Sequence, residues 1–334
     1  MSTPPAGGLA EVAAATGATR RMPAMESMDE HVIERFRRIA PTKTDEPLSR
    51  HTTFGIGGPA DVFVTARNAA ELAAAVIAAR EAHVPYFILG AGSNILVGDR
   101  GIRGVVIDNQ AKGVEGPRLL AGEYILRAES GIPFATLARN LAKQGYRGIE
   151  WACGIPGTLG GAVVYNAGAY EGCLADVLRS VTILDADGAQ KDLPAADLGL
   201  RYRSSAFNRG ELPGCVVLAV EITVRPGDRV ALVRRVAEYD EQRLDAQPRG
   251  RNSGSTFKNP PGHHAWDLID RAGLRGELRG DAQISEKHSN FFVNLGEARA
   301  ADVAALMREA QRRVKEQFGI DLQNEVELVG EGFE

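Results

Sequence analysis

The sequence predicts an α+β fold of more than one structural unit, and three observations support this prediction. The chain has 334 residues, about twice the length of a typical ~150-residue domain. β-branched runs alternate with helical patterns as far as residue 225, and helical spacing follows Pro226-Gly227. The composition is 44% hydrophobic and 25% charged, which is ordinary for a globular protein and excludes wholesale disorder.

Four segments have the start, spacing or stop signals of helices. A capping box at Asn68 precedes an apolar face that extends to about His83. Pro133 begins a second helix and Gly145 ends it. Apolar residues at helical spacing predict the other two helices, over residues 230–243 and 303–318.

Short runs rich in β-branched or aromatic residues predict the strands. These runs are residues 85–89, 105–108, 124–128, 181–184 and 216–224. The first of them opens directly into Gly90-Ala-Gly-Ser-Asn94. A strand therefore leads straight into a glycine loop.

The changes of pattern divide the chain. Residues 1–28 are rich in Ala, Gly, Pro and Thr and are predicted to be a disordered tail, in which several methionines leave the true start codon open. We predict one unit over 29–226, with lobes of about 45–108 and 109–226, and a second unit over 227–334.

Charge and cysteine content exclude several classes of protein. The net charge is −4, and the absence of a long basic run argues against a dedicated nucleic-acid binder. Cys153, Cys173 and Cys215 are odd in number and lack metal-binding spacing. A reducing compartment fits them best, and Cys153 is expected to be a small buried apolar residue. No apolar run approaches the ~20 residues of a membrane span.

Glycine is concentrated in three segments, residues 55–58, 90–104 and 154–172. The first two have glycines whose exposed N–H groups can face phosphate oxygens. Neither contains G-x-G-x-x-G or G-x-x-x-x-G-K-[ST], which argues against a Rossmann site or a P-loop. Tight turns in a β-rich fold explain each loop equally well when it is taken alone.

The third segment, Gly148 to Tyr170, is poor in bulky side chains. It would leave a void unless a flat cofactor or closely packed backbone filled the space. A planar ring is the natural occupant.

Seven segments, in order from about residue 45 to 330, resemble the UDP-N-acetylenolpyruvoylglucosamine reductase family. They are the three glycine segments, Arg201-Tyr-Arg-Ser-Ser205, Gly254-Ser-Thr-Phe-Lys-Asn-Pro260, Ile284 to Asn294, and Leu322-Gln-Asn-Glu-Val326. The resemblance implies a two-lobed FAD-binding domain of the vanillyl-alcohol-oxidase (PCMH) type. A smaller C-terminal α+β substrate-binding domain is expected to follow it.

The resemblance also implies a function. Family members reduce UDP-N-acetylglucosamine enolpyruvate to UDP-N-acetylmuramate with NADPH, through non-covalently bound FAD. This oxidoreductase step serves bacterial peptidoglycan synthesis, and so cell wall biogenesis, cell shape and cell division. We expect a cytoplasmic monomer without a metal, nucleic-acid or membrane partner, in which NADPH and substrate use the same cleft in turn.

Three residues are carried over as catalytic. Hydride addition to C3 of the enolpyruvyl ether leaves negative charge on C2 and the carboxylate. Arg203 is expected to meet that carboxylate, and Ser255 to give a proton to C2. Because a carboxylate would repel the developing anion, we hypothesise that Glu325 has a raised pKa and donates a hydrogen bond. Outside the family these residues would be interpreted as a surface ion pair, a turn serine and a solvated carboxylate.

Further residues are assigned by the same resemblance. Those expected at FAD are Thr53, Ile56, Gly57, Gly58, Gly90, Ala91, Gly92, Ser93, Asn94, Ile95, Gly154, Ile155, Pro156, Gly157, Gly160, Gly161, Asn166 and Arg243. Those expected at substrate are Tyr202, Lys258, Asn259 and His264, the last standing where the family often has lysine. Lys258 is also expected to orient the group that resupplies the proton of Ser255.

Gly168-Ala-Tyr170 runs within a few residues into Asp176. This predicts the shorter subgroup of the family, which lacks an inserted tyrosine loop over the substrate, and it leaves open which residues close the cleft. Two other functions stay open: a flavin oxidase of small alcohols, and a catalytically silent flavin or nucleotide-sugar sensor. A silent protein would be expected to lack Arg203, Ser255 or Glu325, and all three are present.

Overall fold

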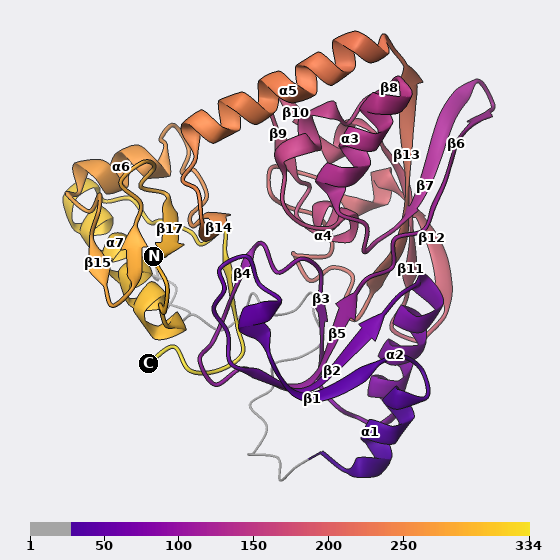
Figure 1. Cartoon of the computed structure of the whole chain (residues 1–334), viewed down its shortest axis with the longest axis horizontal. Helices are drawn as coiled ribbons and strands as arrows, with labels where there is room; N and C mark the ends of the chain where they lie inside the picture. Colours follow the sequence, from indigo (N-terminus) through magenta and orange to yellow (C-terminus); the bar gives the residue numbers. More distant parts are fainter. Residues whose placement is uncertain (1–27) are drawn as a thin grey trace, which may run out of the picture.

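Residues 28–334 are described by a computed structural model, shown in Figure 1. Its helices are α1 (Glu30–Arg37), α2 (Ala69–Glu81), α3 (Phe134–Gln144), α4 (Leu159–Val164), α5 (Arg229–Ala246), α6 (Ala265–Arg271) and α7 (Ala300–Phe318). The predicted tail, apart from Met28, lies outside the described residues.

The first sheet has the strand order β1-β2-β5-β3. Its strands are β1 (Thr42–Pro47), β2 (Pro59–Ala66), β3 (Tyr86–Leu89) and β5 (Ile102–Asn109). β2 and β3 both run parallel to the central β5, whereas β1 is antiparallel. Helices α1 and α2 bury apolar side chains against this sheet, and Asn68 caps α2 by accepting from the Glu71 N–H.

The second sheet is antiparallel, with the order β12-β11-β13-β7-β6. Its strands are β6 (Val114–Leu120), β7 (Glu123–Glu129), β11 (Leu178–Leu184), β12 (Gln190–Pro194) and β13 (Val216–Pro226), and the short β8 (Tyr146–Arg147) pairs with β13. Helices α3 and α4 cover it around a core that includes Phe134, Trp151 and Val220. Between α4 and β11 lies a small hairpin, β9 (Gly168–Ala169) and β10 (Gly172–Cys173).

The C-terminal part contains a four-stranded sheet of order β14-β17-β16-β15, at the left of Figure 1. Its strands are β14 (Arg251–Ser255), β15 (Leu278–Arg279), β16 (Ala282–Ile284) and β17 (Phe291–Asn294). Helices α6 and α7 pack with this sheet around Phe257, Phe292 and Leu306. Phe54 and Leu96, from far earlier in the chain, complete the same core.

Two elements beyond Pro226 pack with the preceding part of the chain. Helix α5 buries Leu232 and Val236 against Ala142 and Cys153, and in Figure 1 it spans the molecule above α3. Strand β18 (Glu327–Val329) pairs in parallel with β4 (Ile95–Val97). The domain limits stay a prediction, but α5 and β18 tie the predicted units together.

The local predictions agree with the observed elements. Gly145 and Gly319 end α3 and α7 in the left-handed conformation, as glycine stop signals should. Helices α1, α4 and α6 were not predicted: they are only eight, six and seven residues long, and α4 also lies inside the glycine-rich segment. Cys153 is fully buried and contacts the Val236 carbonyl, as expected of a small apolar residue, and the three cysteines are free thiols.

Within residues 28–334, no helix combines the length and apolar character needed to cross a bilayer. The same part of the chain has no cluster of three or more His, Cys, Asp or Glu side chains arranged for a metal ion.

Candidate active site

A cavity of about 400 Å³ lies where the two sheets of the N-terminal part meet the C-terminal part. Loop Gly90–Asn94, helix α4 with the residues before it, hairpin β9–β10, and the ends of β14 and β18 all contribute to its wall. Predicted site residues in this wall are Gly90, Ala91, Gly92, Ser93, Asn94, Ile95, Ile155, Pro156, Gly157, Gly160, Gly161, Arg203, Arg243, Ser255 and Glu325.

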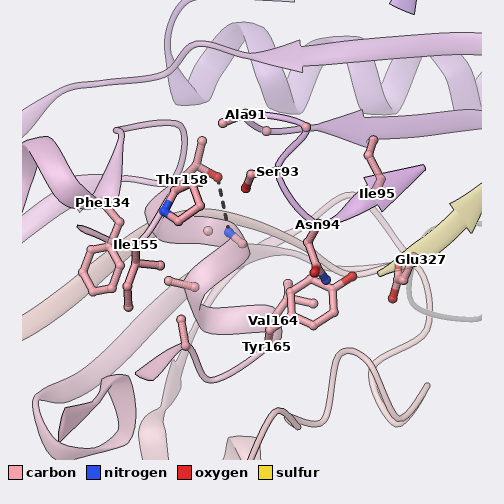
Figure 2. A pocket seen from close by; sticks show the side chains of 18 of the residues that line it. Ala91, Ser93, Asn94, Ile95, Phe134, Ile155, Thr158, Val164, Tyr165 and Glu327 are labelled. Carbon is pink, nitrogen blue, oxygen red and sulfur yellow. Dashed lines mark hydrogen bonds between the residues drawn. The ribbon is translucent and has the colours of Figure 1, made fainter. Parts of the chain in front are cut away.

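Loop Gly90–Asn94 lines the cavity and has unused backbone donors; Figure 2 shows the side chains of Ala91, Ser93 and Asn94 there. None of the backbone N–H groups of Ala91 to Asn94 donates a hydrogen bond to another described residue. Gly92 has φ +59°, and a Cβ there would overlap the His51 carbonyl oxygen. The backbone is thus held in a shape that leaves four neighbouring N–H groups for an anion.

Helix α4 forms the facing wall. Thr158 caps it by accepting from the Gly161 N–H at 3.4 Å, the interaction dashed in Figure 2. A Cβ at Gly157 would lie 3.0 Å from Ser93 Oγ, and one at Gly160 would lie 2.9 Å from Ser130 Cβ. Gly157 thus lets the residues before the helix approach Ser93 of loop Gly90–Asn94, and Gly160 lets the helix pack closely on Ser130.

The structure leaves six of the predicted FAD residues outside the cavity wall, namely Thr53, Ile56, Gly57, Gly58, Gly154 and Asn166. Gly58 donates its N–H to the Gly98 carbonyl at 3.0 Å, and the Gly57 carbonyl accepts from Ser49 N–H at 3.1 Å. Ile56 is buried in the C-terminal core. Thr53 donates its N–H to the Gly92 carbonyl at 3.1 Å, so it supports the loop from behind. The glycines of this turn are needed for backbone packing.

Arg243 brings a positive charge to the wall from helix α5. Within residues 28–334 its guanidinium has no hydrogen-bond or ion-pair partner, and burial lowers its pKa. Gly154, itself outside the wall, makes room for it, because a Cβ there would lie 2.8 Å from Arg243 Cδ. The side chain is therefore free to meet an anionic ligand.

Arg203 and Glu325 form an ion pair inside the cavity. Arg203 Nε donates to Glu325 Oε1 at 2.6 Å, and its terminal nitrogens donate to the Gly168 carbonyl at 3.3 Å. The Glu325 side chain is only 16% exposed. Burial raises the pKa of Glu325 and outweighs the opposite effect of Arg203, the direction that the hypothesis of a protonated donor requires.

Asn166 lies behind this pair instead of in the wall. Its side chain donates to the Arg201 carbonyl at 2.9 Å and accepts from the Ala175 N–H at 3.0 Å. Asn166 therefore holds the Tyr202-Arg203 turn against the β9–β10 hairpin. The hairpin is short and Tyr170 is stacked on Tyr239 of α5, consistent with the absence of a long inserted loop.

Ser255 reaches the cavity at the end of β14. The residues after it run beside the Glu325 segment: the Thr256 carbonyl accepts from Glu325 N–H at 2.8 Å, and Lys258 N–H donates to Gln323 at 2.9 Å. Lys258 lies outside the wall, but its charge acts to lower the pKa of Glu325. The Ser-Thr-Phe-Lys segment and the C-terminal strand are thus assembled as one unit.

The other predicted substrate residues lie outside the cavity wall. Tyr202 is 63% exposed and packs on the Arg203 guanidinium, 5.4 Å from ring centre to Cζ. Asn259 Oδ1 accepts at 3.0 Å from the N–H of Ala265, the first residue of α6. His264 is stacked on Trp266. Their assignment to substrate stays a prediction.

Tyr165 and Glu327 are polar residues of the cavity wall that the sequence reasoning did not name (Figure 2). Tyr165 ends α4, and Glu327 begins β18 with its N–H donated to the Asn94 carbonyl at 3.0 Å. Burial raises the pKa of both side chains. The Glu-x-Glu pattern at 325 and 327 was a usable signal, because alternate residues of an extended segment share a face.

Taken together, the walls fit a flat group joined to an anion. Closely packed glycines leave much of the wall without side chains, four N–H groups of a wall loop have no partner among the described residues, and the wall also contains the Arg243 guanidinium, which has no partner within residues 28–334. FAD has this chemistry, since its ring system is planar and its diphosphate is anionic. The residues present therefore fit the cofactor that the resemblance implied.

Comparison with known proteins gives two matching family models. Residues 60–193 match an FAD binding domain, and residues 245–329 match the UDP-N-acetylenolpyruvoylglucosamine reductase C-terminal domain. These matches confirm the predicted fold class, an FAD-binding domain followed by a smaller C-terminal domain.

Individual relatives extend over most of the chain. A UDP-N-acetylenolpyruvoylglucosamine reductase of Clostridium botulinum is 40% identical over 86% of this chain and 92% of its own length. One from Symbiobacterium thermophilum is 40% identical over 92% of this chain and 98% of its own length. The crystal structure of UDP-N-acetylenolpyruvylglucosamine reductase (MurB) from Thermus caldophilus has a TM-score of 0.71 at 37% identity, covering 86% of this chain and 99% of that one. This chain therefore belongs to the UDP-N-acetylenolpyruvoylglucosamine reductase family, a family of flavin-dependent oxidoreductases.

Proposed function

We propose that the protein reduces UDP-N-acetylglucosamine enolpyruvate to UDP-N-acetylmuramate with NADPH, through FAD. The observation that carries the proposal is that Arg203, Ser255 and Glu325 line one cavity together with loop Gly90–Asn94 and the glycines of 157–161, which we call the glycine cradle. The reaction supplies a precursor of peptidoglycan, and we propose that a monomer performs it in the cytoplasm. The three free thiols agree with a reducing compartment.

FAD is proposed to lie between loop Gly90–Asn94 and helix α4. The unused N–H groups of the loop, together with Arg243, suit its diphosphate. The glycines of Gly157–Gly161 leave room for its ring. When bound, FAD supplies the hydride that originates from NADPH and is added to C3 of the enolpyruvyl group.

Arg203 is proposed to bind the substrate carboxylate, where charge grows as C3 is reduced. Its Nε is occupied by Glu325 and its terminal nitrogens reach only the Gly168 carbonyl, at 3.3 Å. To bind the two terminal nitrogens of Arg203, the substrate carboxylate therefore has to displace only these long hydrogen bonds. A guanidinium fixed in this way stabilises the carboxylate more strongly as further negative charge develops on it than in the singly charged ground state.

Glu325 is proposed to donate a hydrogen bond to the same developing anion from its protonated form. Burial raises its pKa, so the side chain keeps its proton at a pH where an exposed glutamate has lost it. Protonation removes the repulsion that an ionised carboxylate would exert on the enolate oxygens.

Ser255 is proposed to protonate C2. A serine hydroxyl is a weak acid, and it can donate here because the carbanionic carbon is far more basic. The backbone of Lys258 is hydrogen bonded to Gln323, two residues before Glu325. We propose that Lys258 orients the group or water that returns a proton to Ser255.

The proposal is tested with purified protein and a flavin assay in two halves. Flavin should be reduced by NADPH and then reoxidised when the enolpyruvyl sugar nucleotide is added without oxygen. Ser255→Ala should keep the first half-reaction and lose the second. Reoxidation by oxygen but not by the sugar nucleotide would instead indicate an oxidase, and a protein that takes up no FAD would overturn the proposal.

A further inference from the structure

Strand β14 carries an irregularity directly before Ser255. In its pairing with β17, Asn252 is opposite Val293 and Ser255 is opposite Phe291. Three steps along β14 therefore match two steps along β17, so one extra residue is accommodated at Ser253-Gly254. This is a β-bulge, a device that re-aims a side chain beside a site.

The bulge depends on a left-handed backbone conformation. Gly254 has φ +76°, a region that residues with a Cβ rarely adopt. A Cβ built at Gly254 meets no heavy atom within 4 Å. The position therefore needs glycine for its backbone angle and not for space.

Two side chains hold the bulge in place. Asn252 Oδ1 accepts from the Gly254 N–H at 3.0 Å. Ser253, only 4% exposed, donates its hydroxyl to the Ile95 carbonyl at 3.2 Å. Ile95 begins β4, directly after loop Gly90–Asn94. The bulge is thus fastened to the strand that also carries the glycine cradle.

We propose that the bulge at Ser253-Gly254 positions Ser255 for substrate reduction, with Asn252 and Ser253 as its positioning residues. This inference rests on the proposed function. Since side chains alternate between the faces of a strand, loss of the extra residue would turn Ser255 away from the cavity. Reduction of flavin by NADPH does not use Ser255, so only the second half-reaction depends on the bulge.

A matched pair of glycine variants tests the proposal. Gly273 follows α6 with φ +73° and, like Gly254, has no heavy atom within 4 Å of a built Cβ. Gly254→Ala and Gly273→Ala therefore carry the same backbone penalty in the same half of the chain. Gly254→Ala should slow flavin reoxidation by the sugar nucleotide about 100-fold, the scale expected for a misplacement of about 1 Å.

Gly273→Ala should leave both half-reactions unchanged. Because Gly254 also borders the cavity, flavin reduction by NADPH and the visible spectrum of bound FAD are measured in both variants, and Gly254→Ala should slow reoxidation far more than it slows flavin reduction. Equal slowing of reoxidation in the two variants would overturn the inference. If wild-type protein itself fails to reoxidise with the sugar nucleotide, the proposed function is at fault instead.

A second pair of variants decides the matter if Gly254→Ala does not retain FAD. Asn252→Asp keeps the oxygen that accepts from Gly254, and Asn252→Ala removes it. Reoxidation should be about tenfold slower in the alanine variant and restored in the aspartate variant. Equal reoxidation rates in these two variants would show that the hydrogen bond from Gly254 N–H to Asn252 Oδ1 has no role in positioning Ser255.

Discussion

Two glycine-rich turns of similar composition serve different purposes in this protein. In the turn around Gly57-Gly58, backbone packs on backbone, and a Cβ at Gly58 would overlap the Asp99 carbonyl oxygen and the Gly101 nitrogen. In loop Gly90–Asn94, four N–H groups have no partner among the described residues and border the cavity. Clustered glycines thus report close packing in both turns, and the unused donors of the second turn support the proposal that it also binds a ligand.

The largest effect is expected for Gly58→Ala. Its Cβ would collide with backbone atoms, which cannot move aside as the end of a flexible side chain can. We expect the variant to lose about 3 kcal/mol of unfolding free energy, measured by urea denaturation. A loss below about 1 kcal/mol would remove the distinction between the two turns.

Gly161→Ala, in contrast to Gly58→Ala, should weaken FAD binding without reducing the stability of the fold. Its Cβ would lie 3.6 Å from Thr158 Oγ1, an ordinary contact, and otherwise enter the open cavity. Because alanine is a better helix residue, stability should rise by roughly 0.5–1 kcal/mol, while the added methyl weakens FAD binding about 10- to 100-fold. Flavin fluorescence titration of the apoprotein measures this loss, and unchanged affinity would place FAD elsewhere.

Arg243→Met tests whether the unpaired guanidinium belongs to the cradle. We expect FAD affinity to fall about tenfold, as for loss of one charge-assisted hydrogen bond, with little change in stability. Arg234→Met, on the same helix with its side chain 74% exposed, is the matched control and should bind FAD normally. If both variants bind FAD like the wild type, Arg243 faces no anionic part of the cofactor.

The smallest effect is expected on the pH profile of Glu325→Gln. Glu325 is joined to the cradle, because the Asn94 side chain donates to its carbonyl at 3.0 Å. Burial raises its pKa, so the wild-type rate of substrate reduction should hold above the ordinary glutamate range. It should then fall by up to about tenfold per pH unit as the proton is lost.

Glutamine donates a hydrogen bond at every pH, so the variant should lack this alkaline decline. Stopped-flow measurement of flavin reoxidation across the pH range compares the two proteins. An identical decline in both would assign the titration to another group, and Glu327 would be the first candidate because burial raises its pKa as well.

Much of the local structure could be predicted from the sequence. The stop at Gly145 and the cap at Asn68 were correctly placed, because capping and left-handed glycines act through neighbouring residues. Ordered motifs also predicted the family, which the comparisons confirm.

Only the tertiary structure determined how these segments meet. Strands β4 and β18 have three residues each and are separated by more than half of the chain, so no periodicity reveals that they pair. The contact between Arg203 and Glu325 joins residues 122 positions apart, and Tyr165 and Glu327 border one cavity although they are also far apart in the sequence. Local patterns specify φ, caps and exposed faces, whereas such contacts depend on how the whole chain packs, which no short window of sequence contains.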